Sequence, residues 1–161
     1  MPLYLLTHER ELARATNTGQ LVLECPNSCR ELQVSRILWQ RKAPDATLLE
    51  LAAKNRLWLL YPASGQVPSL SADTPLCWEQ HHLVLLDATW QESQKMLRQS
   101  PYLQRIPRLS LAAGPSAYQL RRNQQQGALC TAEVVMQLLE RAGQKEISAE
   151  LAQRFAEFNQ R

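Results

Sequence analysis

The sequence predicts an α/β fold with a largely parallel sheet and flanking helices. Two short apolar runs, Leu83–Leu86 and Leu57–Tyr61, have the length and composition of strands that are buried on both faces. Thr89 and Glu92 then have the spacing of a capping box for a helix that starts near Trp90. Strand and helix patterns alternate along the chain, and this alternation is typical of a parallel sheet.

The other expected elements are less regular. Further strands are predicted at Leu3–Leu6, Leu21–Leu23 and Ile106–Leu111, and Ile37–Trp39 is a brief apolar run. Further helices are predicted at Thr47–Lys54, at Ala128–Ala142 with Thr131 as the expected cap, and from about Ser148 to the end. Residues 63–75 are rich in Ser, Pro and Gly and predict a loop. Pro107 indicates that its strand lies at a sheet edge or that the residue begins the strand.

Length and composition predict one domain over residues 1–161 of a cytoplasmic protein. The net charge of +3 permits an acidic partner without requiring one. No apolar run approaches the roughly 20 residues of a membrane span, and the amino terminus does not resemble a signal peptide. The four cysteines are expected to be reduced, and a zinc site is the less favoured interpretation of their spacing.

Two polar segments have both a functional and a structural interpretation. Arg36, Arg41 and Lys42 flank Trp39, a pattern that suits looped RNA but that is more typical of a solvated sheet edge. The segment Thr16–Gly19 is rich in turn formers and exposed donors, but a plain helix-to-strand connection is the favoured interpretation on local sequence.

Asp87 is the most informative polar residue of the sequence. It follows the buried run Leu83–Leu86, and the carboxyl ends of such strands are where open α/β sheets bind ligands. Since Thr89 can cap the next helix, the Asp87 carboxylate is left without an evident structural role. The alternative is an ordinary turn aspartate, or an aspartate that is itself the cap.

Several motifs together resemble the DTW-domain family. Asp87-Ala88-Thr89-Trp90 resembles the motif that names this family. By contrast, the sequence has no glycine-rich phosphate loop and no serine nucleophile elbow. The other resembling segments, in the order of the family, are Thr16–Gly19 after His8 and Glu11, Leu60-Tyr61-Pro62, Pro107 with Leu109, Tyr118 with Arg121, and Cys130-Thr131 with Glu133.

The resemblance implies a tRNA-uridine aminocarboxypropyltransferase that uses S-adenosylmethionine as donor and no metal. It also implies a SPOUT-like fold with a knotted carboxyl-terminal half. The chain begins at the histidine segment, and the amino-terminal zinc ribbon of many relatives is therefore expected to be missing.

The resemblance also suggests roles for individual residues. Asp87 is the candidate base for uridine N3, with Glu133 in reserve, although Glu133 also suits a helix's first turn. Arg121 is expected to hold the donor's carboxylate, with Arg14 or Arg122 as alternatives. The predicted donor-binding residues are Tyr61, Pro62, Leu86, Leu111, Tyr118, Arg121, Cys130 and Thr131. The predicted tRNA-binding residues are Arg14, Asn17, Thr18, Arg41, Lys42 and Arg122.

Two rival functions remain open. A SPOUT-like RNA methyltransferase would use the same donor but transfer its methyl group. A non-catalytic RNA-binding module would use the arginines to hold phosphate, although such a module gains nothing from a carboxylate at Asp87.

Overall fold

The computed structural model describes residues 1–71, 73–75, 77, 79–111, 116–120 and 128–161, and it confirms an α/β architecture. Its strands are β1 (Leu3–Thr7), β2 (Val34–Leu38), β3 (Leu57–Leu60), β4 (Ser69–Leu70), β5 (His82–Asp87) and β6 (Arg108–Leu109). Its helices are α1 (Thr18–Leu23), α2 (Pro26–Glu31), α3 (Ala46–Ala53), α4 (Trp90–Arg98), α5 (Pro101–Arg105), α6 (Thr131–Arg141) and α7 (Lys145–Asn159), with a short 3-10 helix, η1, at Glu9–Glu11.

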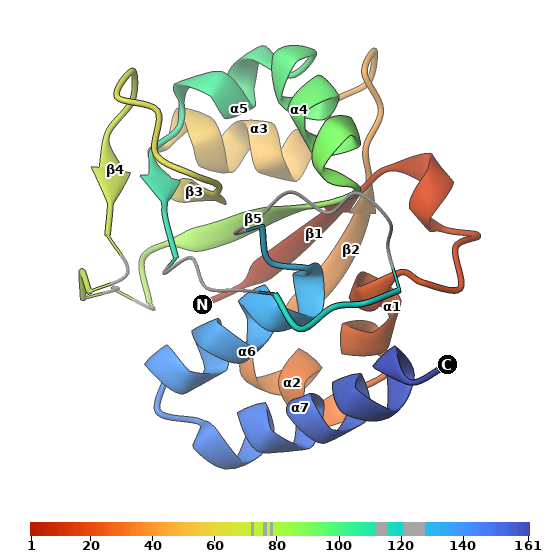
Figure 1. Ribbon diagram of the computed structural model, residues 1–161. Helices are drawn as coiled ribbons and strands as arrows, with labels where there is room; N and C mark the ends of the chain where they lie inside the picture. Colours follow the sequence, from red (N-terminus) through yellow and green to blue (C-terminus); the bar gives the residue numbers. More distant parts are fainter. Residues whose placement is uncertain (72, 76, 78, 112–115, 121–127) are drawn as a thin grey trace.

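The strands form one sheet in the order β2-β1-β5-β3-β6-β4, and every pair of neighbours is parallel. Helices α3, α4 and α5 cover one face, and α1, α2, α6 and α7 cover the other (Figure 1). The central strand β5 supplies side chains to both layers: Leu83 and Leu85 to the core on the α6 side, and Val84 and Leu86 to the core on the α4 side. The prediction of a strand buried on both faces is confirmed.

The segment Leu21–Leu23 is helical, so the predicted strand there is wrong. The Asn17 side chain accepts a hydrogen bond from the Gln20 N–H and begins α1 at Thr18. Leu21 and Val22 are buried against the core on the α6 side. Three apolar residues fit a strand and a short helix equally well, and here the cap decides.

Other boundaries also differ from the prediction. The strand predicted at Ile106–Leu111 is reduced to Arg108–Leu109, and it lies between β3 and β4 rather than at an edge. Pro107 precedes this strand, in agreement with the alternative that it begins the strand. A two-residue strand, β4, lies inside the predicted loop 63–75. The last helix starts at Lys145, and its stripe of Leu151, Phe155 and Phe158 is buried as predicted.

Among the described residues, no helix has both the length and the apolar character that crossing a bilayer demands.

Candidate functional site

Asp87 ends the central strand β5 and is almost fully buried, with 1% of its surface exposed. The next helix, α4, has the predicted capping box: Thr89 Oγ1 accepts from the Glu92 N–H at 3.2 Å, and Glu92 accepts from the Thr89 N–H at 3.0 Å. Asp87 is therefore not needed as a cap, as the sequence indicated.

The Asp87 carboxylate nevertheless has a structural role, which corrects the sequence-based expectation. Thr7 Oγ1 donates to Oδ2 at 3.0 Å, while Asn17 Nδ2 and Thr131 Oγ1 both donate to Oδ1 at 3.0 Å. The Arg36 guanidinium lies 3.5 Å from Oδ2 and forms an ion pair with it. These donors come from β1, the start of α1, the start of α6 and β2, so one buried carboxylate joins four elements.

Gly19 allows α1 to approach this carboxylate. A Cβ atom at Gly19 would lie 2.5 to 2.6 Å from the three carboxylate atoms of Asp87, which is closer than real Cβ contacts. The glycine is therefore required for space.

Asn17 and Thr18 lie inside the protein, with 2% and 3% of their surfaces exposed. Asn17 also donates to Glu11 at 2.8 Å, and Thr18 Oγ1 accepts from the Ala132 N–H of α6 at 3.3 Å. The interpretation of this segment as exposed donors is wrong, because both side chains are used within the fold. Direct contact with RNA is not supported for either residue.

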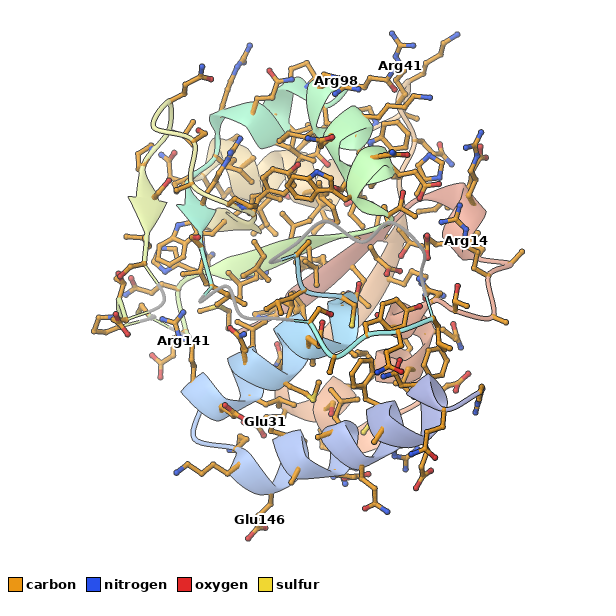
Figure 2. The ribbon with its side chains drawn as sticks, viewed as in Figure 1. Arg14, Glu31, Arg41, Arg98, Arg141 and Glu146 are labelled. Carbon is orange, nitrogen blue, oxygen red and sulfur yellow. The ribbon has the colours of Figure 1, made fainter. Side chains whose placement is uncertain are left out.

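The three cations around Trp39 do not form one cluster. Arg36 points inward and donates to Thr7 at 3.2 Å and to Asn17 at 3.0 Å, in addition to its ion pair with Asp87. Arg41 and Lys42 are exposed. In Figure 2, Arg41 projects from the side of the molecule that carries α3 and α4, and Arg98 of α4 projects from the same side, whereas Glu31 and Glu146 lie on the opposite layer.

Arg14 is paired with acids rather than free for phosphate. Its guanidinium forms a short ion pair with Glu11 and another with Glu92 at 3.0 Å. Burial alone would raise the pKa of Glu92, but the Thr89 N–H and the Arg14 guanidinium outweigh it, so the pKa lies below 4.5. Arg14 therefore connects the start of α4 to the loop that follows η1.

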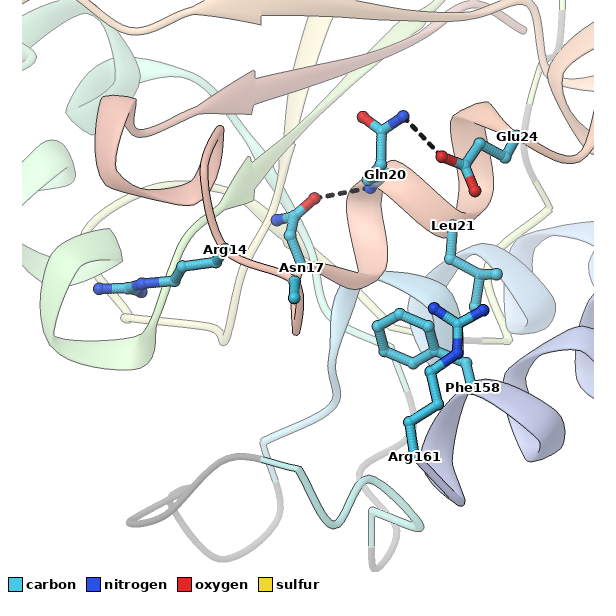
Figure 3. A pocket seen from close by; sticks show the side chains of 8 residues that line it. Arg14, Asn17, Gln20, Leu21, Glu24, Phe158 and Arg161 are labelled. Carbon is cyan, nitrogen blue, oxygen red and sulfur yellow. Dashed lines mark hydrogen bonds between the residues drawn. The ribbon is translucent and has the colours of Figure 1, made fainter.

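An open pocket of about 220 Å³ lies beside α1. Arg14 and Asn17 line one side, and Leu21 and Phe158 line another, with the Arg161 guanidinium over the Phe158 ring (Figure 3). Glu24 adds an acidic group to this lining. The mixture of charges means that the pocket has no clear preference for an anion.

Glu133, the reserve base, is occupied by hydrogen bonds. Its carboxylate accepts from Ser116 Oγ at 2.6 Å, the Ala117 N–H at 2.7 Å and the Cys130 N–H at 2.8 Å. The helix therefore begins at Thr131 with Cys130 as its cap residue, and the prediction that Thr131 caps the helix is wrong. Thr131 instead uses its hydroxyl group on Asp87.

Two predicted donor-binding residues, Tyr118 and Cys130, are buried. Tyr118 is 6% exposed, its hydroxyl donates to the Thr16 carbonyl, and its ring packs against Phe155. Burial raises the pKa of the Cys130 thiol to about 12, so this thiol is protonated at neutral pH.

Tyr61 and Pro62 follow β3 and lie beside a residue that the sequence analysis did not single out. The Tyr61 ring stacks on Trp90 with centroids 5.4 Å apart, and the Arg108 guanidinium lies 5.2 Å from the Tyr61 centroid. Arg108 Nη1 donates to the Pro62 carbonyl at 2.9 Å. The signal for Arg108 was a charged residue inside a short apolar strand pattern.

The remaining predicted positions divide into two groups. Leu86 is buried in the core on the α4 side, and Leu111 packs partly exposed against the core on the α6 side. Arg121 and Arg122 lie outside the described residues. Among the described residues, no group of three or more His, Cys, Asp or Glu side chains is arranged to hold a metal ion, and the four cysteines are free.

Comparisons with known proteins identify the family. The model of the DTW domain matches residues 1–161. The tRNA-uridine aminocarboxypropyltransferase 2 of Drosophila melanogaster is 32% identical over 139 residues, which cover 84% of this chain and 53% of that protein. The chain thus spans about half the length of this curated relative. No solved structure matches the chain. On the family match over its whole length, the chain belongs to the DTW-domain family.

Proposed function

We propose that this chain is a tRNA-uridine aminocarboxypropyltransferase. The donor is S-adenosylmethionine, the acceptor is N3 of a tRNA uridine, and the product besides the modified base is methylthioadenosine. The name of the Drosophila relative supports the tRNA-modifying activity. The identity of the donor rests on the aminocarboxypropyl group in that name and on the chemistry that such a transfer needs.

One structural observation carries the proposal. The DATW motif ends the central strand of a parallel sheet, and the segments that resemble the family's other motifs meet at the same strand ends. Thr131 of α6 and Asn17 before α1 contact Asp87, while Arg108 of β6 contacts the Pro62 carbonyl after β3. Because ligands of open α/β sheets bind at the carboxyl ends of strands, these segments surround the expected site.

The transfer requires positioning more than activation. Uridine N3 attacks the methylene carbon bonded to the donor's sulfonium, the carbon–sulfur bond breaks, and the sulfur keeps the electron pair and leaves as a neutral thioether. The proton of N3 passes to solvent water. The chain's main task is to hold the methylene carbon, rather than the methyl group, against N3.

Within this proposal, Asp87 acts as a positioning residue. Its two oxygens already accept three hydrogen bonds and an ion pair, and only 1% of its surface is exposed. To accept the N3 proton it would have to lose the contact with Thr7 or Thr131. The Glu133 carboxylate also accepts several hydrogen bonds already, and we propose that its role is to hold residues 116–117 beside α6.

We also infer that the fold is of the SPOUT class and that its carboxyl-terminal half is knotted. The parallel sheet and the return of α6 to the end of β5 support this inference. An experimental structure that traces residues 112–127 tests it, and an unthreaded path would contradict it.

The product tests the proposed function. Purified protein, bulk tRNA and S-adenosylmethionine should release methylthioadenosine, and the tRNA should gain an aminocarboxypropyl group by nucleoside mass spectrometry. Release of S-adenosylhomocysteine would instead identify a methyltransferase. Absence of both products together with absence of donor binding by calorimetry would indicate an RNA-binding module.

The tRNA contacts can be tested separately on the exposed pair Arg41 and Lys42. If both touch phosphates, their replacement by alanine should reduce the slope of log K against log salt by about two. Glu31→Ala and Glu146→Ala on the opposite layer are the controls, and they should leave the slope unchanged. An unchanged slope in the double variant would mean that this pair is only a solvated edge.

A further inference from the structure

We propose that Arg108 binds the α-carboxylate of the S-adenosylmethionine donor. This inference deepens the proposed function and rests on it. It assigns a donor-binding role to Arg108, which lies between the two residues, Pro107 and Leu109, that carry the family resemblance in this segment.

The first observation is a buried cation without an anion. Arg108 is 8% exposed. Among the described residues, no carboxylate lies within ion-pairing distance of its guanidinium, although Arg14, Arg36, Lys54 and Arg154 all have such partners. A buried charge is costly unless it is paired and hydrogen-bonded. The contacts that Arg108 does make, one carbonyl and one aromatic face, supply no negative charge.

The second observation is an unused donor. Arg108 Nε is buried and has no hydrogen-bond acceptor among the described residues, while Nη1 is used by the Pro62 carbonyl. The Nε edge of a guanidinium presents two parallel N–H groups, which match the two oxygens of a carboxylate. The Tyr61 ring lies against the guanidinium and the Pro62 carbonyl holds Nη1, so two contacts restrict how the Nε edge can turn before any ligand arrives.

The third observation is position. Arg108 reaches the loop after β3, and Tyr61 of this loop stacks on Trp90 of the DATW motif. A carboxylate held here would anchor the far end of the donor's methionine chain near the strand ends. The reactive methylene carbon lies between this anchor and the sulfonium, so the anchor would restrict which carbon can face N3.

A donor carboxylate suits this site better than a tRNA phosphate. Only 8% of the Arg108 surface is exposed, so a small planar anion at the end of a flexible chain suits the site better than a phosphate of a bulky backbone. The phosphates of a folded tRNA would instead meet exposed cations such as Arg41 and Arg98.

The test compares three ligands by calorimetry in the absence of tRNA. The ligands are S-adenosylmethionine, its decarboxylated analogue and methylthioadenosine. The wild-type protein should bind S-adenosylmethionine about ten- to a hundredfold more tightly than the analogue, the range expected for a hydrogen bond to a charged group. Arg108→Met should abolish this preference and leave the affinity for methylthioadenosine within about twofold, which also reports that the variant is folded.

Two further variants complete the experiment. Arg108→Lys keeps a charge but loses the fork, and it should retain only part of the preference; it also carries the test if Arg108→Met does not fold. Arg105→Met, on the exposed part of α5, is the matched control and should behave like the wild-type protein.

The outcomes separate this inference from the proposed function. An equal affinity for the two donors in the wild-type protein, or a preference that persists in the Arg108 variants, overturns the inference and leaves the proposed function standing. In a separate titration with tRNA, weaker binding by the Arg108 variants together with an intact donor preference would make Arg108 a phosphate contact and would also overturn the inference. A wild-type protein that binds none of the three ligands overturns the proposed function together with the inference.

Discussion

Replacing Asp87 by Asn should destabilise the protein, because the carboxylate joins four elements. The best orientation of the amide keeps its oxygen where Asn17 and Thr131 donate and points its NH2 group at Thr7 and Arg36. The Thr7 hydroxyl then has to accept from this NH2 group although it already accepts from Arg36 Nε at 3.2 Å. The substitution therefore removes the ion pair and one charge-assisted hydrogen bond.

The expected loss of stability follows from these contacts. A hydrogen bond to a charged group contributes about 1.5–3 kcal/mol. Breaking a fully buried ion pair costs about 3–5 kcal/mol, but the Arg36 side chain is 20% exposed and keeps part of its hydration, so the lower end applies. Because both contacts are made by the same carboxylate, the two costs overlap; we expect a loss of about 3 kcal/mol, and thus a decrease in Tm of about 6–12 °C for a chain of this size.

The assay is thermal and denaturant unfolding of the variant, with turnover measured well below its Tm. Asp45→Asn is the matched control: Asp45 caps α3 through a bond to the Leu48 N–H at 3.0 Å, and Asn caps equally well. This control should change stability by less than about 0.5 kcal/mol. An unchanged Tm in Asp87→Asn, combined with a roughly 10²–10⁴-fold loss of turnover, would refute the positioning role and restore Asp87 as the general base.

Three further predictions concern the same strand ends. Gly19→Ala, which normally favours a helix, should instead destabilise by about 1–3 kcal/mol in denaturant unfolding, because the methyl group overlaps the Asp87 carboxylate; a stabilised variant would contradict the close approach. The pKa of Glu92 is lowered in the folded protein, so its contribution to stability is present above pH 4.5 and is lost as the pH falls through its folded pKa. The difference in unfolding free energy between the wild-type protein and Glu92→Gln should thus shrink between about pH 5 and about pH 3, and a constant difference would contradict the shift. Glu133→Gln must turn its NH2 group toward a donor, so hydrogen exchange at the Ala117 amide should become faster, whereas unchanged protection would show that Glu133 does not hold this segment.

The architecture follows from local patterns in the sequence. The continuous apolar run Leu83–Leu86 predicts a strand buried on both faces, and it is the central strand of a parallel sheet. Thr89 and Glu92 predict the start of α4, and the capping box is present. These features are predictable because each depends on residues that are close in sequence.

Short elements and distant contacts are not predictable in the same way. Leu21–Leu23 is too short to reveal its period, and the cap at Asn17 makes it helical. The hydrogen-bond partners of Asp87 are Thr7, Asn17 and Thr131, which lie 80, 70 and 44 residues away in the sequence. Neighbouring residues show only that Thr89, and not Asp87, can cap the next helix. They do not reveal the distant contacts, so the expectation that the carboxylate has no structural role is wrong.

The strand ends carry opposite charges on the two faces of the sheet, and this difference bears on which residues meet the ligand. On the side of α1 and α6, the negative charge of Asp87 is already used by Thr7, Asn17, Arg36 and Thr131. On the side of α4, the positive charge of Arg108 has a carbonyl and an aromatic ring but no anion among the described residues. A charge that is satisfied within the fold stabilises the site, whereas a buried charge with an unused donor can bind a ligand. Asp87, which the sequence pattern singles out, thus organises the site through its contacts within the fold. Arg108, which lies in a two-residue strand and is not singled out by the sequence pattern, is the residue that we propose for donor binding.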